Sequence, residues 1–498
     1  MGSPPVKKNK VSLSVAFVVA LVFYSIINAS ASFFPRDLLL SDPDTFWHIQ
    51  TGQWILDHWQ VPTVDFFSYT AAGRPWISTE WLSEIVFAIA FNIGGWHVVS
   101  NLAAIFCAVS IGILCFYLLR HLRFSVAIGW TAVTAMAIMP HALARPHIFS
   151  YVVLIIWMTN LIEAYESDNF TRRLFVLAPL MVLWANIHGS FTFGLGLLYL
   201  FIGFSLYKKF VQRIYVKCWP LLVVLLIITF CAVLTPYGIS SALMTKGLLD
   251  LKYTIPQIVE LQSPNFQNDY IHSFLLVVLL SAMAGLGVRL RGPTLVAFGI
   301  IVFVGLSYNR GLVMFFLLSP IILARPFATS ACFLAPQFSG EELPNADIDP
   351  MLQYLQKRLF AVLATSVTVA ALATVLPWWL RDVAPPKSIA PAAAIDFVRR
   401  SNIKGNVFND YNFGGFLIWS HIPTFVDGRA LPFGDDFLHK YFDALVDFDS
   451  AFQILNEYNI GWVILMPRLP LAKAIARYPS WVTVYSDEYS VIFERRPK

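Results

Sequence analysis

The stretch Ser41-Asp42-Pro43-Asp44-Thr45-Phe46-Trp47-His48 places two carboxylates directly after the first long apolar segment of the chain, Val11–Ala31. Charges beside a membrane cost free energy unless they are paired or used. From this stretch onward, apolar residues recur at helical spacing at Phe46, Ile49, Trp54 and Ile55. This pattern predicts a helix over about residues 44–59 that lies on the membrane surface, with the acidic pair at its start.

The composition is that of a membrane protein. Of the 498 residues 57% are hydrophobic and 13% are charged, and the mean hydropathy is +0.64. Soluble domains carry about 25% charged residues, so the chain is predicted to be a polytopic α-helical membrane protein. The net charge of +5 is spread over short clusters, which excludes a nucleic-acid partner. Of the five cysteines, four lie in or at the edge of apolar segments and none lies in the parts predicted to be outside, so a disulfide framework is not expected.

The first loop is unusually long. Lys7, Lys8 and Lys10 precede the first apolar run, so the N-terminus is predicted to be cytoplasmic and residues 32–96 to form an outer loop. Within this loop, Trp81–Ile93 is apolar but about half as long as a membrane span requires, and Gly94-Gly95 closes it. We interpret it as a second surface helix; a full span is the alternative.

Eleven spans follow from the remaining apolar runs. They are Val11–Ala31, Val98–Leu119, Val126–Met139, Ile148–Ile162, Leu174–Trp184, Phe191–Leu206, Trp219–Leu234, Ile271–Leu286, Leu295–Leu306, Leu312–Ala324 and Leu359–Leu380, with a polar inner loop at about 326–358. Basic clusters at 120–123, 172–173, 208–217 and 289–291 then all fall on the cytoplasmic side, as the positive-inside rule expects. The C-terminus is predicted to lie outside.

The chain is expected to divide into a membrane domain, residues 1–382, and a soluble α/β domain outside the membrane, residues 383–498. The linker contains Pro385-Pro386. Periodicity and turn residues in this tail predict helices at Ala392–Arg400 and Phe452–Tyr458, a turn into a helix at Asn412–Gly415, strands at Asn406–Asn409, Thr424–Val426 and Trp462–Leu465, and a closing hairpin of Trp481–Tyr485 with Ser490–Glu494.

With this topology, unusual polar residues collect on the outer face. They are Asp42, Asp44, His48, Glu80, Arg145, His147, Asn186, His188, Tyr237, Glu260 and Arg310. The cytoplasmic ends carry little except Lys and Arg. This asymmetry indicates an outward-facing site that binds a substrate, rather than a pore through the membrane.

The acidic pair has two interpretations. Asp42 and Asp44 could supply a general base or a carboxylate pair for a divalent cation such as Mg²⁺ or Mn²⁺. Alternatively, Ser41 or Asp42 caps the surface helix and Asp44 lies in its first turn. Asp42 could do both.

Two arginines at the outer ends of apolar segments are candidates for phosphate binding. The planar guanidinium of Arg145 or Arg310 can bond two oxygens of a substrate phosphate at once. The alternative is a non-specific contact of these side chains with lipid headgroups. His48, His147 and His188 could bind a substrate or form ordinary structural hydrogen bonds. In the tail, Asp427-Gly428-Arg429 follows a predicted strand; Asp427 and Arg429 are candidates for substrate binding, and a plain core with an Asp-Gly loop is the alternative.

The residues quoted above also carry a resemblance. The predicted architecture resembles that of the GT-C membrane glycosyltransferases, such as oligosaccharyltransferases, protein mannosyltransferases and the lipid A aminoarabinose transferase. The shared features are an acidic residue in a long first outer loop with two surface helices, many spans and an outer C-terminal domain. Asp42–His48, Asp65–Thr70, Glu80-Trp81-Leu82, Asn186–Gly189 and Val426–Arg429 are similar to a group of bacterial membrane proteins placed beside that superfamily.

The resemblance implies transfer of a sugar from a polyprenyl-phosphate donor at the outer membrane face, with Asp42, or Asp44 close behind it, as the catalytic carboxylate. In that superfamily the second outer loop commonly holds another acidic residue. Here it holds Arg145-Pro146-His147, which favours neutralisation of the phosphate by Arg and His over metal binding.

Together these observations predict an inverting glycosyltransferase of the bacterial cytoplasmic membrane. The expected partners are a polyprenyl-phosphate-sugar donor, membrane lipids and a glycan, lipid or protein acceptor. The predicted donor contacts are Arg310 and Arg145. The acidic pair is the candidate site for a divalent cation, and the sequence points to no other cofactor. A non-enzymatic partner in polysaccharide export, or a scaffold that keeps a degenerate transferase fold, is the alternative.

Overall fold

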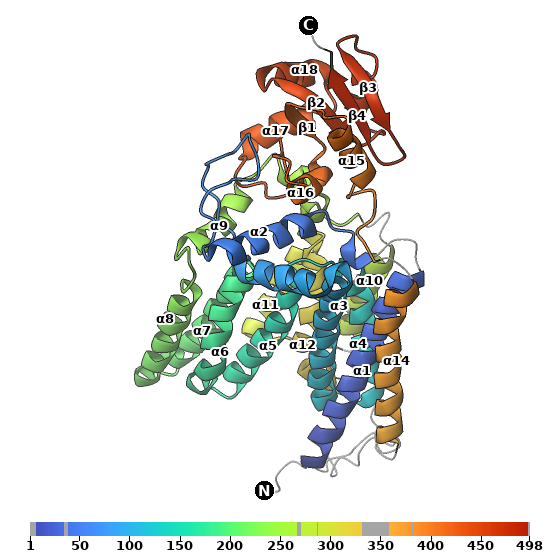
Figure 1. Cartoon of the computed structure of the whole chain (residues 1–498). Coiled ribbons are helices and arrows are strands. Elements are labelled where there is room, and N and C mark those ends of the chain that lie inside the picture. Colours follow the sequence, from blue (N-terminus) through green and yellow to red (C-terminus); the bar gives the residue numbers. More distant parts are fainter. Residues whose placement is uncertain are drawn as a thin grey trace.

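The computed structural model describes residues 6–33, 38–265, 270–285, 287–330, 358–380 and 383–496. A bundle of long helices forms one end of the molecule and a small sheet with its own helices forms the other (Figure 1). The bundle contains α1 (Val6–Phe33), α3 (Trp81–His121), α4 (Phe124–Ile138), α5 (His147–Glu166), α6 (Phe170–Ile187), α7 (Phe191–Val211), α8 (Trp219–Ala232), α10 (Tyr270–Gly285), α11 (Pro293–Ser307), α12 (Gly311–Ser330) and α14 (Leu359–Leu380).

Each predicted span coincides with one of these helices. Within the described ranges, eight helices are long and apolar enough to cross a membrane, and α11 and α14 contain shorter apolar stretches. The chain is therefore a multi-pass membrane protein, and the count of eleven crossings stays a prediction. The predicted inner loop at 326–358 lies largely outside the described residues, as does position 382 at the expected domain boundary.

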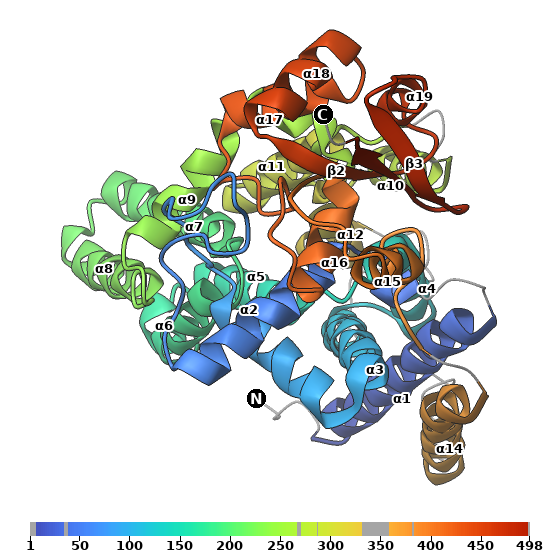
Figure 2. The ribbon, with the colours of Figure 1, turned by 45° about the horizontal axis from the view of Figure 1, so that its top comes forward.

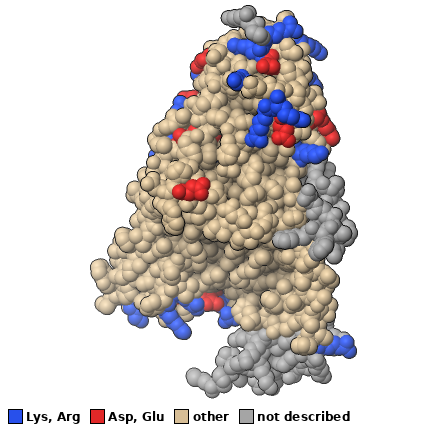
Figure 3. Space-filling model, in the orientation of Figure 1, with Lys and Arg blue, Asp and Glu red and all other residues tan. Residues whose placement is uncertain are grey.

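The charge distribution follows the helices. On the face drawn in Figure 3, a broad belt over the bundle has few charged residues, and Lys and Arg gather at the edge furthest from the sheet. Such a belt is what contact with lipid requires, because an uncompensated charge there is costly.

Two helices lie across the sheet-facing end of the bundle (Figure 1). One is α2 (Asp44–His58), as predicted, and the other is the first part of α3. The helical path of α3 breaks at Gly94 (φ −164°, ψ 30°) and Gly95 (φ 61°, ψ −149°), where the chain turns from the surface helix into the span. The positive φ of Gly95 suits a residue without a Cβ atom.

The tail forms a four-stranded sheet in the order β1-β2-β4-β3. The strands are β1 (Asn406–Asn409), β2 (Ile460–Leu465), β3 (Trp481–Ser486) and β4 (Val491–Arg495). β1 runs parallel to β2, and the other pairs are antiparallel. Successive residues of β2 face opposite sides, and Trp462 and Val463 contribute to two separate cores. This confirms a small α/β unit.

The prediction of a strand at Thr424–Val426 is wrong. The backbone of Thr424 donates to the Phe67 carbonyl (3.1 Å) and accepts from the Tyr69 amide (3.1 Å), so it pairs with the first loop instead of the sheet. The helices of the tail are α15 (Ala392–Arg400), α16 (Gly414–Trp419), α17 (Asp435–Ala444), α18 (Phe448–Glu457) and α19 (Pro470–Ile475), of which α17 and α19 were not predicted.

The first loop and the tail pack against each other. α16 lies on α2 (Figure 2), and Phe46 of α2 contacts Phe416 of α16 edge to face with ring centroids 5.2 Å apart. This contact holds the start of α2, with its acidic pair, between the bundle and the sheet.

Candidate active site

A cavity of about 440 Å³ lies where the first loop, the bundle end and the tail meet. Asp42, Asp44, Glu80, Arg145, Glu260, Arg310, Asp410, Arg429 and Arg468 are its charged lining residues. Six of these were candidate site residues from the sequence: Asp42, Asp44, Glu80, Arg145, Arg310 and Arg429. We call this space the acidic cavity.

Arg145 is the centre of the cluster in this cavity. Its Nη1 donates to Asp42 Oδ2 (3.0 Å) and to Glu260 Oε1 (3.0 Å), and its Nη2 donates to Asp44 Oδ2 (2.6 Å). Its side chain is 12% exposed, so these charge-assisted hydrogen bonds are only weakly screened by water. One guanidinium therefore joins three carboxylates from two separate segments.

Local structure explains how the acidic pair meets this arginine. Asp42 lies just before α2, and its Oδ1 accepts the backbone N–H of Asp44 (2.8 Å), one of the amides that a helix start leaves without a partner. Thr45 Oγ1 donates to the Ala144 carbonyl (3.0 Å), which holds the start of α2 against the turn before α5. Asp42 thus satisfies the helix start with one oxygen and Arg145 with the other.

Glu260 connects the two predicted phosphate ligands. It lies in the short helical turn η5 (Val259–Leu261), and its carboxylate also pairs with the Arg310 guanidinium. The Arg310 amide donates to the Glu260 carbonyl (3.1 Å), so backbone and side chains hold the two residues together. The Arg310 side chain is 44% exposed and lines the cavity.

The pKa values of the carboxyls differ sharply within this cluster. Burial, with contributions from Asp44 and Glu260, raises the pKa of the Asp42 carboxyl to about 7, although Arg145 acts to lower it. Burial also acts to raise the pKa of Glu260, but Arg145 and Arg310 outweigh it and lower that pKa to about 2. Near neutral pH, Asp42 can therefore gain or lose a proton while Glu260 stays ionised.

A second group of titratable side chains adjoins the cavity. His48 Nδ1 lies 3.2 Å from Glu84 Oε1, and its Nε2 lies 3.6 Å from Glu80 Oε2. His188 Nε2 lies 3.3 Å from Glu80 Oε1. Because the Ser190 amide donates to His188 Nδ1 (3.1 Å), the proton of neutral His188 lies on Nε2 and points to Glu80.

Burial dominates the acid–base chemistry of this second group. It raises the pKa of Glu80 to about 7. Burial, together with the charges of Arg310 and Arg145, lowers the pKa of His188 to about 3. Burial also lowers the pKa of His48 well below its usual value, followed by the effect of Arg145. Both histidines are consequently neutral at physiological pH.

Several predicted site residues do not line the cavity. His147 Nε2 lies 3.1 Å from the His141 carbonyl, and the Tyr237 hydroxyl donates to the Pro62 carbonyl (2.8 Å). The contact of His147 is the ordinary structural hydrogen bond that was the alternative for the histidines. His48 and His188 lie one residue removed from the cavity, behind Glu80.

Asp427 and Arg429 form a buried ion triad with Asp65. Arg429 Nη2 donates to Asp427 Oδ2 (2.7 Å), its Nη1 pairs with Asp65 Oδ1, and the three side chains are at most 1% exposed. The guanidinium also lies over the rings of Trp76 (4.7 Å) and Phe67 (5.1 Å). This triad joins the tail to the first loop, so the polar groups of Asp427 are engaged in structure.

The glycine between these two residues is required by a close approach. A Cβ atom at Gly428 would lie 1.8 Å from Asp44 Oδ1. The Asp-Gly-Arg sequence of the tail therefore forms a wall directly against the acidic pair.

The acidic pair does not fit a divalent cation in this arrangement. Asp42 and Asp44 both turn an oxygen to Arg145, whose guanidinium takes the position between them that a metal ion would need. Within the described ranges, no group of three or more His, Cys, Asp or Glu side chains has the geometry of a metal site.

The sequence analysis did not assign roles to three residues that the structure brings forward. Glu260 was predicted to lie on the outer face but was not among the candidate site residues. Asp65 appeared only within Asp65–Thr70, one of the motifs that carry the family resemblance. Asp410, which lines the cavity, accepts the amide of Asn412 (2.9 Å). The arginine partners of Glu260 and Asp65 lie far away in sequence, so local patterns could not assign roles to these two residues.

Comparisons with known proteins address the fold. No model of a known protein family matches the sequence, and a search of curated proteins finds no match. Among solved structures, the chain is similar to the apo oligosaccharyltransferase of Archaeoglobus fulgidus, with a TM-score of 0.52 and 12% identity over 90% of this chain and 69% of that one. A second structure of that archaeal enzyme, AglB, with an inhibitory peptide and a dolichol-phosphate, gives a TM-score of 0.51 and 11% identity over 90% and 69%.

Apo ArnT from Cupriavidus metallidurans gives a TM-score of 0.50 and 14% identity over 96% of this chain and 97% of that one. Both proteins are GT-C membrane glycosyltransferases. At such low identities the likeness establishes the fold alone, and it confirms the predicted GT-C-like architecture.

Proposed function

We propose that this protein is a membrane glycosyltransferase. It transfers a sugar from a polyprenyl-phosphate-linked donor to a glycan, glycolipid or protein acceptor at the outer face of the bacterial cytoplasmic membrane. The observation that carries this proposal is the Arg145-centred cluster, which lines a cavity above the bundle in a fold shared with such enzymes. The archaeal enzyme of this fold binds dolichol-phosphate, so the fold accommodates a lipid phosphate.

Arg310 and Arg145 are the proposed ligands of the donor phosphate. Arg310 is half exposed at the cavity and presents the planar fork that suits phosphate oxygens. In the present arrangement the Glu260 carboxylate takes up donors of both arginines. The incoming phosphate replaces Glu260 on at least one of them, because both anions need the same N–H groups.

Asp42 is the proposed general base. A base works best when its pKa lies near the operating pH, and Asp42, with a pKa of about 7, meets this condition. The acceptor oxygen bonds to the anomeric carbon while the bond from that carbon to the phosphate oxygen breaks. The acceptor proton passes to Asp42, the lipid phosphate leaves with its electron pair, and attack from the opposite side inverts the anomeric centre.

Neighbouring groups support this assignment. Asp44 holds Arg145 in place through the 2.6 Å contact, and Arg145 supplies the positive charge that a cation would otherwise provide. Trp47 lines the cavity, and its indole N–H is buried without a hydrogen-bond partner in the described part of the chain, so it can donate to a sugar hydroxyl. Glu80, also with a pKa of about 7, is the second candidate for the base.

The test is donor turnover by the purified protein in nanodiscs with a polyprenyl-phosphate sugar. We expect Asp42→Asn to lose at least about a hundredfold in kcat, since general bases contribute about 10²–10⁴, while Glu80→Gln and chelation by EDTA have smaller effects. Wild-type turnover by Asp42→Asn and Glu80→Gln alike would refute the assignment of the base.

The proposed phosphate contacts have a separate test. Mass spectrometry of lipids that co-purify with the intact protein should detect polyprenyl phosphates in the wild type and a marked loss in Arg310→Ala. Equal amounts in both proteins would contradict a phosphate role for Arg310.

A further inference from the structure

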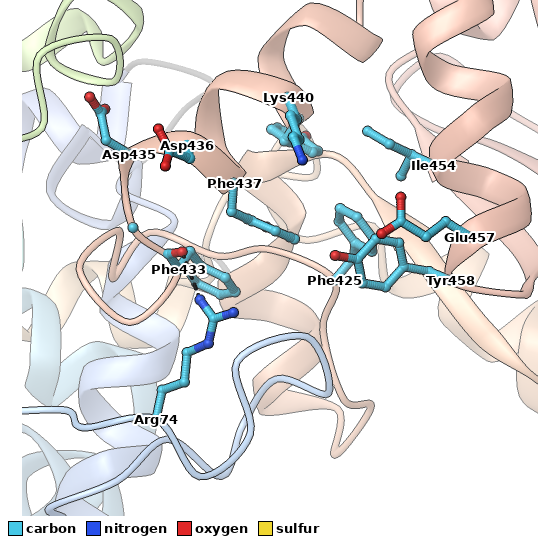
Figure 4. Close-up of a pocket in the computed structure, with 12 residues that line it drawn as sticks. Arg74, Phe425, Phe433, Asp435, Asp436, Phe437, Lys440, Ile454, Glu457 and Tyr458 are labelled. Atoms are coloured by element: carbon cyan, nitrogen blue, oxygen red, sulfur yellow. Dashed lines mark hydrogen bonds between the residues drawn. The ribbon is translucent and has the colours of Figure 1, made fainter.

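The geometry points to a second, non-catalytic site that binds a neutral oligosaccharide. This site is a cavity of about 430 Å³ in the tail, lined by α17, the end of α18 and Arg74 of the first loop (Figure 4). Its volume falls within the roughly 300–1,000 Å³ range of ligand pockets. We call it the tail cavity; neither Asp42 nor Arg145 lines it.

The floor of the tail cavity is aromatic. Phe437 stacks on Phe433 with centroids 5.6 Å apart and an interplanar angle of 22°, and meets Tyr458 edge to face at 6.2 Å. Phe425 supports both Phe437 (5.3 Å) and Tyr458 (5.2 Å) from below and is fully buried. Phe437 and Tyr458 keep part of their surface open. Rigid, partly exposed rings of this kind offer faces for the apolar side of a sugar ring.

The rim of the tail cavity is polar and uncommitted. Asp436, Lys440 and Glu457 are exposed and form no hydrogen bond or ion pair within the described part of the chain. Arg74 Nη1 donates to the Phe433 carbonyl (3.0 Å), which fixes its guanidinium at the opening. In Figure 4, Arg74 and Lys440 extend toward the aromatic rings from opposite sides.

These groups match a neutral saccharide better than an ion. The cavity lining carries two cationic groups, Arg74 and Lys440, and three carboxylates, Asp435, Asp436 and Glu457, of which Asp435 already accepts hydrogen bonds from Tyr253 and Thr254. A ligand with many hydroxyls uses donors and acceptors together, whereas an anion is repelled by the carboxylates and a cation by Arg74 and Lys440. α17 and α18, which supply most of its lining, lie on the sheet side of the molecule, away from the helices of the bundle (Figure 1).

The tail cavity is close to the acidic cavity along the chain. Ala430 lines the acidic cavity and Phe433 lines the tail cavity, so the two walls are three positions apart in the chain, at most about 11 Å. Asp435 also accepts from the Thr254 amide (2.9 Å) and hydroxyl (2.7 Å), which ties α17 to the segment that carries Glu260. The tail cavity can therefore hold a more distant part of a glycan that reacts in the acidic cavity. This role in the reaction rests on the proposed function, whereas the binding of an oligosaccharide to the tail cavity does not.

The experiment measures binding of the full-length protein in nanodiscs to an array of immobilised neutral and acidic oligosaccharides. The test variant is Lys440→Met with Glu457→Gln, whose side chains are exposed and unpaired, so the fold is not at risk. Lys473→Met on α19, outside the cavity, is the matched control. Asp42→Asn is included to separate binding from transfer.

We expect the wild type to bind neutral oligosaccharides and the double variant to bind them at least about tenfold more weakly, since the Lys440 donor is removed and the charged Glu457 acceptor is replaced by a neutral amide. Lys473→Met and Asp42→Asn should bind as the wild type does. The inference is overturned if the wild type binds no saccharide, if the double variant binds equally well, or if binding is confined to acidic saccharides. Whether Asp42→Asn loses turnover or keeps it tests the proposed function and does not change the conclusion on oligosaccharide binding.

Discussion

Replacing Arg429 with methionine should release the tail from the first loop. The substitution keeps much of the side-chain volume but removes the guanidinium that joins Asp65 and Asp427. It also removes the cation–π contact with Trp76 at 4.7 Å. Both carboxylates would then remain buried without a cationic partner.

The expected cost is large because the triad is at most 1% exposed. Removing one partner of a buried ion pair costs about 3–5 kcal/mol. Because about 1.4 kcal/mol corresponds to a factor of ten, the fraction of molecules in which the tail opens should rise by at least about a hundredfold. The helical bundle lies outside this contact and should keep its own stability.

Native-state proteolysis in detergent measures this opening, since cleavage of transiently open molecules reports their population. The control is the triple variant Arg429→Met, Asp65→Asn, Asp427→Asn, which removes the buried charges together and should restore much of the protection. If Arg429→Met is cleaved as slowly as the wild type, or if the triple variant is no better than the single one, the triad does not stabilise the contact as we infer.

Three further predictions concern the acidic cavity. First, kcat/KM should fall as the pH drops below about 7, because Asp42 must be ionised to act as base and burial raises its pKa to about 7. Arg145→Gln removes a charge that lowers this pKa, so the pH at which kcat/KM falls should move upward. An unchanged pH profile in this variant would contradict the inferred effect of Arg145 on Asp42. Second, Glu260→Gln frees the arginines that it occupies, so binding of polyprenyl phosphate, measured by titration in nanodiscs, should tighten severalfold; weaker binding would show that this carboxylate helps to hold the lipid. Third, Gly428→Ala places a methyl group 1.8 Å from a carboxylate oxygen of the acidic pair and should abolish turnover or lower the thermal midpoint, whereas Gly196→Ala, with open space around its Cβ position, should be neutral in the same two assays.

Local patterns in the sequence were sufficient for most elements. Apolar runs of span length predicted the bundle helices, and the short run Trp81–Ile93 with Gly94-Gly95 predicted a surface helix followed by a turn. Alternation and turn residues predicted five strands of the tail, of which four form the sheet. The prediction failed at Thr424–Val426. A strand-like sequence indicates an extended backbone that needs hydrogen-bond partners, but it does not indicate which segment supplies them.

That Asp42, Asp44, Arg145 and Arg310 lie at the same end of the bundle could likewise be predicted, because the loops that join antiparallel spans alternate between the two ends. Their pairing could not. Asp65 and Arg429 are 364 positions apart, and nothing in either segment indicates that the two side chains form a buried ion pair. Whether a carboxylate is a base, a partner of an arginine or part of a structural triad depends on what packs over it. Burial and neighbouring charges set its pKa, and both are properties of the tertiary structure rather than of the residue.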